Sequence, residues 1–548
     1  MEKKSLPAFL PLIFAMLLIL GIFIGSKLDY VTEGKQFFAL PSKNFNKLNE
    51  LINFIEQEYV DEVSKDELVE KAINSLLEDL DPHSNYISPK ELAAHNDPLE
   101  GNFEGIGIEF SIQKDTVTVI NPIPGGPSEA VGIISGDRFV KVDGVVIAGI
   151  KIANEDVVSK LKGSKGTMVT ISVLRRGENQ LIDFTVKRAT IPIKSLEVSY
   201  MVNKNTGYIK ISRFSKNTYE EFLNHAHKLK SKGMSKLVLD LRGNGGGYLH
   251  SAVKLADEFL DKGKLIVYTE GKARPRKSYY ATKDGDFKDT ELIILVDENS
   301  ASASEILAGA IQDNDKGIII GRRTFGKGLV QEQVLWPDNS AIRLTIARYY
   351  TPTGRSIQKT YKNGKEDYYK ETYSRFEKGE LSERDSIHFP DSLKYYTSGG
   401  RLVFGGGGIM PDYFIPLDTS DASPFLSELF QLSMVSQFAF EYVDNNREKM
   451  KKYKSFDHFN SSFFITENLF NEFLTFSEKN GVKTDFTGLK KSGKLIRTRL
   501  KAHIARQQWK NEGFYPIVHD LDNTFQKALS ILAKNKGSLV GLPLQTAN

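Results

Sequence analysis

The hydrophobic pattern of the chain changes several times, and each change predicts a different kind of structure. Between 44 and 100, apolar residues recur at three- and four-residue steps, which is typical of amphipathic helices. Short apolar runs separated by glycine follow to about 189 and predict a small β-rich domain. From 191 the pattern alternates between buried strands and helices, as in an α/β layer. Beyond about 420 helical spacing returns.

Seven short runs have the length and apolar content of strands, three in the β-rich domain and four in the α/β region. Two amphipathic helices are predicted between the later strands, at 250–260 and 305–312. Ser423 and Pro424 have the residue types of an N-cap and a first helical position, so another helix should begin there. The predicted strands are 116–120, 138–142, 169–174, 236–241, 264–269, 291–296 and 317–320.

Length and composition limit the classes of protein to consider. The 548 residues are too many for one core, and a content of 40% hydrophobic and 26% charged residues is that of ordinary globular proteins. A net charge of +4 is small for this length and gives no reason to expect nucleic acid. The lack of cysteine excludes disulfides, thiolate metal sites and a cysteine nucleophile. No cluster of His and carboxylates has metal-ligand spacing, so we expect neither metal nor cofactor.

The first 27 residues look like a targeting segment. Lys3 and Lys4 precede an almost unbroken apolar run, Leu6 to Gly25, which is near the minimum for a membrane-spanning helix. No clear A-x-A cleavage site follows. We therefore favour an uncleaved signal anchor with most of the chain outside the cytoplasm, on the periplasmic side, and leave open cleavage near Gly25 and Ser26 with release to the periplasm.

A glycine-rich loop enters the first strand of the β-rich domain at 105–110. Consecutive backbone amides beside an apolar pocket suit a terminal carboxylate, and a strand edge can pair with an extended peptide. With the later glycine turns at 132, 136 and 144, the whole segment 101–190 resembles a PDZ domain. This resemblance implies that a peptide carboxylate binds at the amides of Ile106, Gly107 and Ile108.

One serine of the α/β region lies at a strand-to-helix junction. Ser302 falls between the predicted strand 291–296 and the predicted helix 305–312. A helix start offers unpaired N–H groups and the positive end of the helix dipole, where an oxyanion would be stabilised. The same serine and Glu305 have the S-x-x-E spacing of a capping box, which is a commoner role for serine. This stretch alone leaves both roles open.

A serine nucleophile needs a base, and a lysine is the best candidate in this chain. The nine histidines are scattered, and none accompanies a G-x-S-x-G motif; His250, near a glycine-rich loop, is the nearest alternative. A lysine can act if its pKa falls from about 10.4 to near 7 or 8, which requires the charged form to be destabilised by roughly 4 kcal/mol. Lys327 lies between two glycines in an apolar setting, and the Gln331 amide could orient it without restoring its charge.

The same lysine belongs to a sequence that is close to a phosphate-binding P-loop, at 321–328. Gly328 stands where a P-loop needs Ser or Thr for magnesium, and the following residues 329–336 predict an extended segment instead of a helix. Nucleotide binding is therefore the weaker interpretation.

Three spaced motifs together resemble one protease family. The runs S-A-S-A-S-E-I at 300–306 and T-F-G-K-G at 324–328, followed by Gln331, are similar to the catalytic core of the C-terminal processing peptidases, also called tail-specific proteases. The resemblance spans about 44 to 354 and includes the PDZ-like insert. It implies a nucleophile, a general base and a residue that supports the base, at Ser302, Lys327 and Gln331. It further implies oxyanion donors at the amides of Ala303 and of Gly246 or Gly247, and supporting residues at Arg242, Glu305, Asp313 and Thr324.

We therefore expect a multidomain α/β serine endopeptidase with a PDZ-like insert, an N-terminal membrane segment and a helical extension of open function. It would bind protein substrates by their C-terminal tails and process or degrade them through an acyl-enzyme. An oligomer or adaptor partner is left open. The alternatives are a non-catalytic PDZ scaffold and, less favoured, a P-loop-like nucleotide-binding protein. The expected parts are 1–27 (targeting), 43–100 (helical), 101–190 (PDZ-like), 191–420 (α/β protease core) and 421–548 (extension).

Overall fold

The structure is a computed structural model that describes residues 10–25 and 46–534. The described residues fall into two compact units, which divide after Ala72. The first unit contains α1 (Leu10–Gly25), α2 (Lys47–Glu58) and the first turns of α3 (Lys65–Glu78). Asn46 caps α2 by accepting a hydrogen bond from the Asn49 amide at 3.3 Å. Every later element belongs to the second unit.

Helix α1 lies within the apolar run that predicted a membrane anchor. It comprises all of the described residues of this segment, Leu10–Gly25. Of the helices in the described ranges, none is both long and apolar enough to cross a membrane. The structure therefore does not support the predicted membrane segment. Lys3, Lys4 and Ser26, on which the orientation and cleavage predictions depend, lie outside the described residues.

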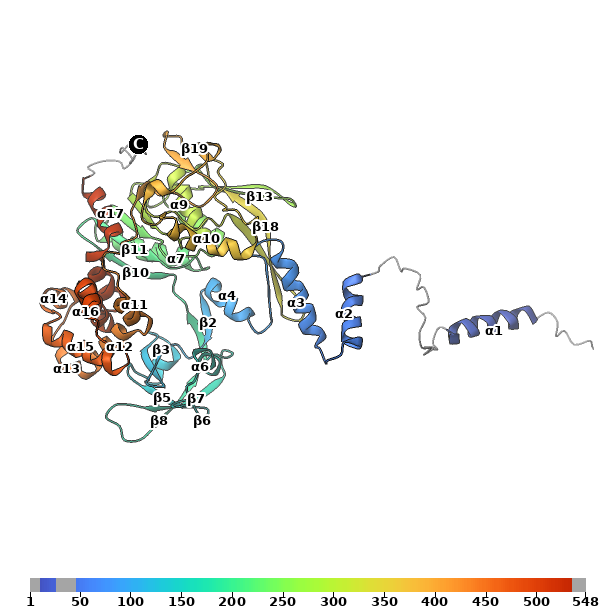
Figure 1. Ribbon diagram of the computed structural model, residues 1–548, viewed down its shortest axis with the longest axis horizontal. Coiled ribbons are helices and arrows are strands. Elements are labelled where there is room, and N and C mark those ends of the chain that lie inside the picture. Colours follow the sequence, from blue (N-terminus) through green and yellow to red (C-terminus); the bar gives the residue numbers. More distant parts are fainter. Residues whose placement is uncertain (1–9, 26–45, 535–548) are drawn as a thin grey trace, which may run out of the picture. The chain divides into compact units, whose positions relative to one another are not determined.

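The α/β core is built on a six-stranded sheet in the order β10-β11-β12-β15-β16-β21. Figure 1 labels its first two strands, β10 and β11. β10 and β11 pair antiparallel, and the other neighbours pair parallel. Parallel strands that are covered on both faces have continuous apolar sequences, which is why the predictions for this sheet are confirmed. The strands are β10 (Leu196–Met201), β11 (Thr206–Ile211), β12 (Lys236–Asp240), β15 (Glu291–Val296), β16 (Gly317–Gly321) and β21 (Tyr413–Phe414).

Alternate side chains of the central strands enter two different cores. Leu292 and Ile294 pack in a cluster with the helices of one face, whereas Ile293 and Leu295 pack with α17 (Asn523–Lys534) on the other. The last described helix of the extension therefore covers the second face of the sheet. The helices of the first face are α7 (Thr218–Ser231), α8 (Leu249–Asp257) and α9 (Ala303–Asp313).

A second, antiparallel sheet is organised around β18 (Ala341–Tyr350), which pairs with β1, β13 and β17. The predicted strand 264–269 lies here, in β13, and not in the parallel layer. The segment after Lys327 is a strand, β17, so the helix that a P-loop requires is missing at this position. The remaining strands are β1 (Asn85–Ile87), β13 (Leu265–Gly271), β14 (Arg274–Tyr280) and β17 (Leu329–Leu335).

The PDZ-like segment forms its own sheet, in the order β3-β4-β5-β7-β8 with β6 on β5, around its own apolar core. The chain enters and leaves it through β2 and β9, which pair antiparallel from Asn102 with Pro192 to Gly105 with Ala189. This pairing makes the segment an insert. Its elements are β2 (Asn102–Gly105), β3 (Ile108–Gln113), β4 (Thr116–Pro122), α5 (Pro127–Ala130), β5 (Arg138–Val142), β6 (Val145–Val146), α6 (Asn154–Leu161), β7 (Met168–Leu174), β8 (Ile182–Lys187) and β9 (Ala189–Pro192).

The polar, aromatic segment from 351 to 408 is more ordered than its composition suggests. It contains α10 (Lys365–Glu377) and a hairpin of β19 (Lys394–Tyr396) and β20 (Leu402–Phe404). On α10, Arg375 and Tyr368 are buried, and Arg375 pairs with Glu371 at 2.6 Å. Its many charged residues suggest exposed irregular structure, but charged side chains on this helix turn inward and neutralise each other.

The extension after 420 is helical, as predicted, and encloses its own core. Ser423 caps the first helix by accepting from the Leu426 amide at 3.1 Å, with Pro424 at the first helical position. The helices are α11 (Pro424–Gln431), α12 (Met434–Asn445), α13 (Arg447–Met450), α14 (Phe456–Ser462), α15 (Glu467–Lys479), α16 (Phe486–Val518), η3 (His519–Leu521) and α17. The core helix α4 (Leu92–Glu100) precedes the PDZ-like insert.

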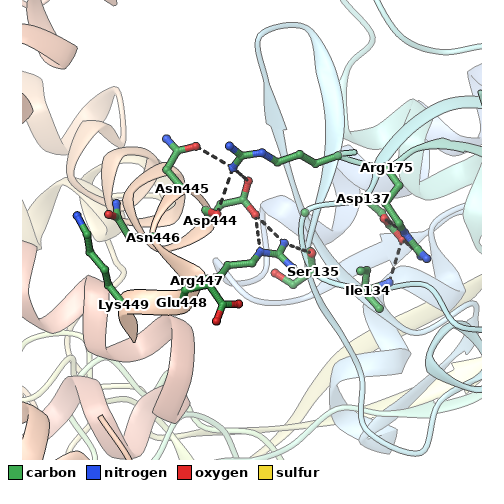
Figure 2. A pocket seen from close by; sticks show the side chains of 12 residues that line it. Ile134, Ser135, Asp137, Arg175, Asp444, Asn445, Asn446, Arg447, Glu448 and Lys449 are labelled. Carbon is green, nitrogen blue, oxygen red and sulfur yellow. Dashed lines mark hydrogen bonds and ion pairs between the residues drawn. The ribbon is translucent and has the colours of Figure 1, made fainter. Parts of the chain in front are cut away.

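Polar contacts connect the extension to the PDZ-like domain around a surface pocket of about 530 Å³ (Figure 2). Arg447 donates to the Ser135 carbonyl oxygen at 3.1 Å, and Arg176 donates to Asp444 at 3.2 Å. Both arginine side chains are about half exposed. Exposed ion pairs contribute little stability each, so these contacts alone hold the two parts together weakly.

Candidate active site

Ser302 occupies the junction between β15 and α9, as predicted, and its backbone is strained. It is the N-cap of α9, with φ 57° and ψ −113°. Residues other than glycine rarely adopt such a conformation, which costs of order 1–3 kcal/mol and is concentrated at functional sites. Glu305 accepts from the Ser302 amide at 2.8 Å, the half of a capping box in which the acidic residue reaches back. The capping geometry is therefore compatible with a functional role at this half-buried position.

The Glu305 carboxylate joins the serine segment to the lysine loop. Besides the Ser302 amide, it accepts from the amides of Gly326 at 2.8 Å and Lys327 at 2.9 Å and from the Thr324 hydroxyl. The side chain is fully buried, and burial raises its pKa to about 7 although four donors favour the charged form. Glu305 and Thr324, expected to be supporting residues, thus fix the two chain segments against each other.

A tyrosine that the sequence did not single out bridges the same two segments. The hydroxyl of Tyr349, on β18, lies 2.7 Å from the Lys327 carbonyl oxygen and 3.1 Å from that of Ser302. Tyr349 is almost completely buried. The backbones of Ser302 and Lys327 therefore share two hydrogen-bonding partners, one on the amide side and one on the carbonyl side.

Lys327 lies in a partly buried position next to the predicted amide partner. Its Nζ donates to Gln331 Oε1 at 3.1 Å. Burial, reinforced by the nearby positive charge of Arg343, lowers the pKa of Lys327 to about 8. An amine with this pKa is neutral in a minor but appreciable fraction of molecules near physiological pH, and that neutral form can accept a proton. His250, the alternative base, is exposed on α8.

Gln331 is itself held by the turn that ends the N-terminal helices. Its Nε2 donates to the His83 carbonyl oxygen, so the amide oxygen is directed to Lys327. The turn is fixed by Asp81, which accepts from the amides of His83 and Ser84, each at 2.9 Å. The His83 side chain bonds the Tyr368 hydroxyl at 2.9 Å. His83 is therefore a structural residue of the site.

Helix α10 supports the backbone of the loop that precedes Lys327. Arg375 donates to the carbonyl oxygens of Thr324 at 2.8 Å and Phe325 at 3.2 Å. Lys359 places its Nζ 3.9 Å from the centre of the Phe325 ring. These contacts restrict the backbone just before Lys327, and no sequence signal pointed to them.

The predicted oxyanion donors lie on both sides of Ser302. A side chain on Gly246 would place its Cβ 2.7 Å from Ser302 Cβ and 2.9 Å from the Ala303 nitrogen, so the glycine lets its loop contact the serine directly. The Gly246 amide already donates to Asn244 Oδ1 at 2.9 Å. Among the described hydrogen bonds, none uses the amide of Ala303 or of Gly247. The pair Ala303 and Gly247 is therefore better suited to a developing oxyanion than Gly246.

Two other supporting residues have different surroundings. Arg242 follows β12 and donates to Asp240 at 2.7 Å and to Asp522, in the extension, at 2.7 Å. Asp313 lies at the far end of α9, about 15 Å from its start at 1.5 Å per residue. It pairs with buried Arg355 at 2.6 Å. Asp313 thus stabilises the core at a distance from Ser302 and Lys327.

The residues expected to bind a peptide carboxylate form the entrance to β3. The Ile106 carbonyl oxygen accepts from the amide and hydroxyl of Ser128, at 3.1 and 2.7 Å. Gly107 has φ 73°, and its carbonyl oxygen accepts from the Ile123 amide at 2.9 Å. Ile108 is the first residue of β3. The carbonyl groups of Ile106 and Gly107 are thus fixed by hydrogen bonds within the domain.

Four family models match successive parts of the chain. Residues 205–367 match peptidase family S41, and this segment contains every proposed catalytic and oxyanion residue. Residues 105–186 match the PDZ domain. Residues 26–91 match the N-terminal domain of the activating protease CtpB. Residues 425–510 match a family of unknown function, DUF8443.

Proteins similar over most of their length are C-terminal processing proteases. A carboxy-terminal-processing protease of Bartonella bacilliformis is 36% identical over 321 residues, which are 58% of this chain and 73% of the relative. The carboxy-terminal processing protease CtpA of Bacillus subtilis is 31% identical over 393 residues, 71% of this chain and 81% of the relative. Among solved structures, a photosystem II D1 C-terminal processing protease shares 29% identity, with 57% and 89% of the two chains covered and a TM-score of 0.33.

Proposed function

The chain belongs to the carboxy-terminal-processing serine proteases of peptidase family S41, and we propose that Ser302 is its nucleophile, Lys327 its general base and Gln331 the residue that orients the base. The observation that carries this assignment is the double connection between Ser302 and Lys327 through Glu305 and Tyr349. Glu305 joins the two backbone amides, and Tyr349 joins the two backbone carbonyl oxygens. These contacts fix the distance between the two backbone segments, as a nucleophile and its base require.

The proposed reaction is acyl transfer to serine and then to water. Lys327 Nζ takes the Ser302 hydroxyl proton while the oxygen forms a bond to the scissile carbonyl carbon. The amides of Ala303 and Gly247 stabilise the oxyanion. When the intermediate collapses, the carbon–nitrogen bond breaks and Lys327 returns the proton to the leaving amine. Water, deprotonated by Lys327, then hydrolyses the ester and releases Ser302.

We assign substrate capture to the PDZ domain. The amides of the loop at Ile106, Gly107 and Ile108 would bind the free carboxylate of a protein C-terminus, and the edge of β3 would pair with the residues before it. A protein substrate would thus be held by its tail while an upstream peptide bond reaches Ser302.

Export from the cytoplasm is the second part of the proposal. Its support is the pair of lysines followed by the apolar run Leu6–Gly25. Alkaline phosphatase fused after residue 45 should be active only if the segment directs export, whereas cytoplasmic retention would give an inactive fusion. Carbonate extraction of the exported fusion would then separate membrane attachment from release.

The central experiment uses the enzyme without residues 1–45 and an unstructured protein substrate. Wild type should generate fragments, and Ser302→Ala and Lys327→Ala should each reduce cleavage to background with unchanged circular dichroism. Fragment masses identify the cleaved bonds. Cleavage by either variant would contradict the assignment of that residue. Amidation of the substrate C-terminus should raise KM, and an unchanged KM would contradict the role of the PDZ loop.

A further inference from the structure

The extension after 420 is more than an appended domain, because its last described helix packs against the central sheet of the catalytic core. Its last described helix, α17, lies on the face of the central sheet opposite α9 (Figure 1). Phe525, Ala528 and Leu532 of α17 are buried in one cluster with Ile293 and Leu295 of β15, the strand that leads to Ser302. This part of the extension thus completes the layered structure that carries the nucleophile.

An acidic residue just before α17 reaches the carboxyl end of β12. Asp522 accepts two hydrogen bonds from the Arg242 guanidinium, Nη1 to Oδ1 at 3.0 Å and Nη2 to Oδ2 at 2.7 Å. It also caps α17 by accepting from the Phe525 amide at 3.0 Å. Both side chains of the pair are only about one-fifth exposed. A bidentate, largely buried pair of this kind fixes the position of the arginine closely.

Arg242 is also tied to its own strand. Its side chain donates to Asp240, which is almost fully buried, and its carbonyl oxygen accepts from Lys210 Nζ at 2.9 Å. Burial would raise the pKa of Asp522, but the positive charge of Arg242 holds it below its usual value. The two carboxylates and two cations are therefore charged and mutually compensated at the carboxyl end of β12.

The loop that follows Arg242 leads directly to the nucleophile. The Gly243 amide donates to Asp297 at 2.9 Å, and the Asn244 carbonyl oxygen accepts from the Ala301 amide at 3.0 Å and the Ser304 hydroxyl at 2.9 Å. Gly246 then contacts Ser302. A displacement of Arg242 would therefore be transmitted to the segment that supplies one side of the oxyanion site.

We propose that Asp522 is a positioning residue for catalysis: by fixing Arg242 it holds the loop 243–247 in register with Ser302, so that the extension completes the active site. This inference rests on the proposed function of Ser302 and of the Gly247 amide. It assigns a role to a residue outside the matches to peptidase family S41 and to DUF8443. The competing role is purely structural, in which the pair only helps the extension to adhere to the core.

The test compares Asp522→Asn with Asp522→Glu and Asp520→Asn in the full chain. Asn has nearly the same shape but loses the charge and one strong acceptor, so kcat should fall about tenfold with KM changed less than about twofold, because only the transition state uses the oxyanion site. Ki of a peptide boronate, which mimics the tetrahedral state, should rise in parallel. Asp522→Glu should recover most of kcat. Asp520→Asn, whose carboxylate makes no described contact with Arg242, should resemble wild type.

The structural alternative gives a different set of results. If Asp522→Asn only loosens the extension, kcat per folded molecule, corrected by the thermal unfolding curve, stays at the wild-type value and the proposal is overturned. An unchanged boronate Ki together with a reduced kcat would overturn it as well. Activity of Ser302→Ala would instead refute the proposed function itself. Inactive Ser302→Ala with fully active Asp522→Asn refutes only this inference.

Discussion

Lys327 Nζ donates to Gln331 Oε1 at 3.1 Å, so the group in contact with the proposed base is a neutral amide. The buried carboxylate of Glu305 accepts from the Lys327 amide instead. Burial can therefore hold the pKa of Lys327 near 8, because no carboxylate on Nζ restores the charged form. This arrangement makes the pH dependence of the enzyme specific enough to test.

Activity should increase with pH in two steps. Lys327 must be neutral, which occurs above its pKa of about 8, and Glu305 must be ionised to accept from four donors, which occurs above its pKa of about 7. The logarithm of kcat should therefore rise with a slope near 2 below pH 7, a slope near 1 between the two values, and a plateau above about pH 8.5. A flat profile between pH 6 and 9 would contradict a lysine base.

The variant Gln331→Glu should move the upper step to higher pH. A carboxylate on Nζ stabilises the charged lysine and raises its pKa by about 1–3 units, so kcat at pH 7 should fall about tenfold or more and recover at alkaline pH. The matched control Gln331→Leu removes the hydrogen bond without adding charge and should lower kcat with no alkaline shift. A Gln331→Glu profile that superimposes on wild type would show that Lys327 is not the titrating group.

Elements with a local sequence signal were predicted well, and elements formed by distant contacts were not. The strand 291–296 could be recognised because every side chain from Leu292 to Val296 is apolar, which reflects burial on both faces. The packing of α17 against that strand could not, because nothing within 523–534 identifies its partner. Helix α10 was missed since its buried charges look like surface charges until their partners are known.

The variant Gly246→Ala should inactivate the enzyme. The new Cβ would lie 2.7 Å from both Ser302 Cβ and the Ala301 carbonyl oxygen, and φ of 98° is unfavourable for alanine. The loop must shift, so kcat should fall by about 10²-fold or more, the effect of losing an oxyanion donor. At Gly245 a Cβ would meet nothing within 4 Å, so Gly245→Ala should keep kcat within about threefold. Equal activity of the two variants would argue against close contact of this loop with Ser302.

The site shows the same division between local and distant signals. Ser302, Lys327 and Gln331 could be proposed from the sequence because they lie in or just after short motifs, and the structure connects the segments of Ser302 and Lys327 through Glu305. Tyr349 was missed since it bonds only backbone carbonyl groups, and any buried strand tyrosine has the same sequence appearance. The sequence likewise could not choose between Gly246 and Gly247, because that depends on the Asn244 side chain.

Finally, Ser302→Gly should be more stable than Ser302→Ala, although both should be inactive. The φ of 57° and ψ of −113° at this position strain any residue with a Cβ, and glycine releases about 1 kcal/mol of that strain. At Ser304, within α9, the order should reverse, because glycine costs about 1 kcal/mol relative to alanine inside a helix. Chemical denaturation of the four variants gives both differences. A Ser302→Ala variant at least as stable as Ser302→Gly would mean that the backbone at Ser302 is not strained, and that its placement by the fold needs another explanation.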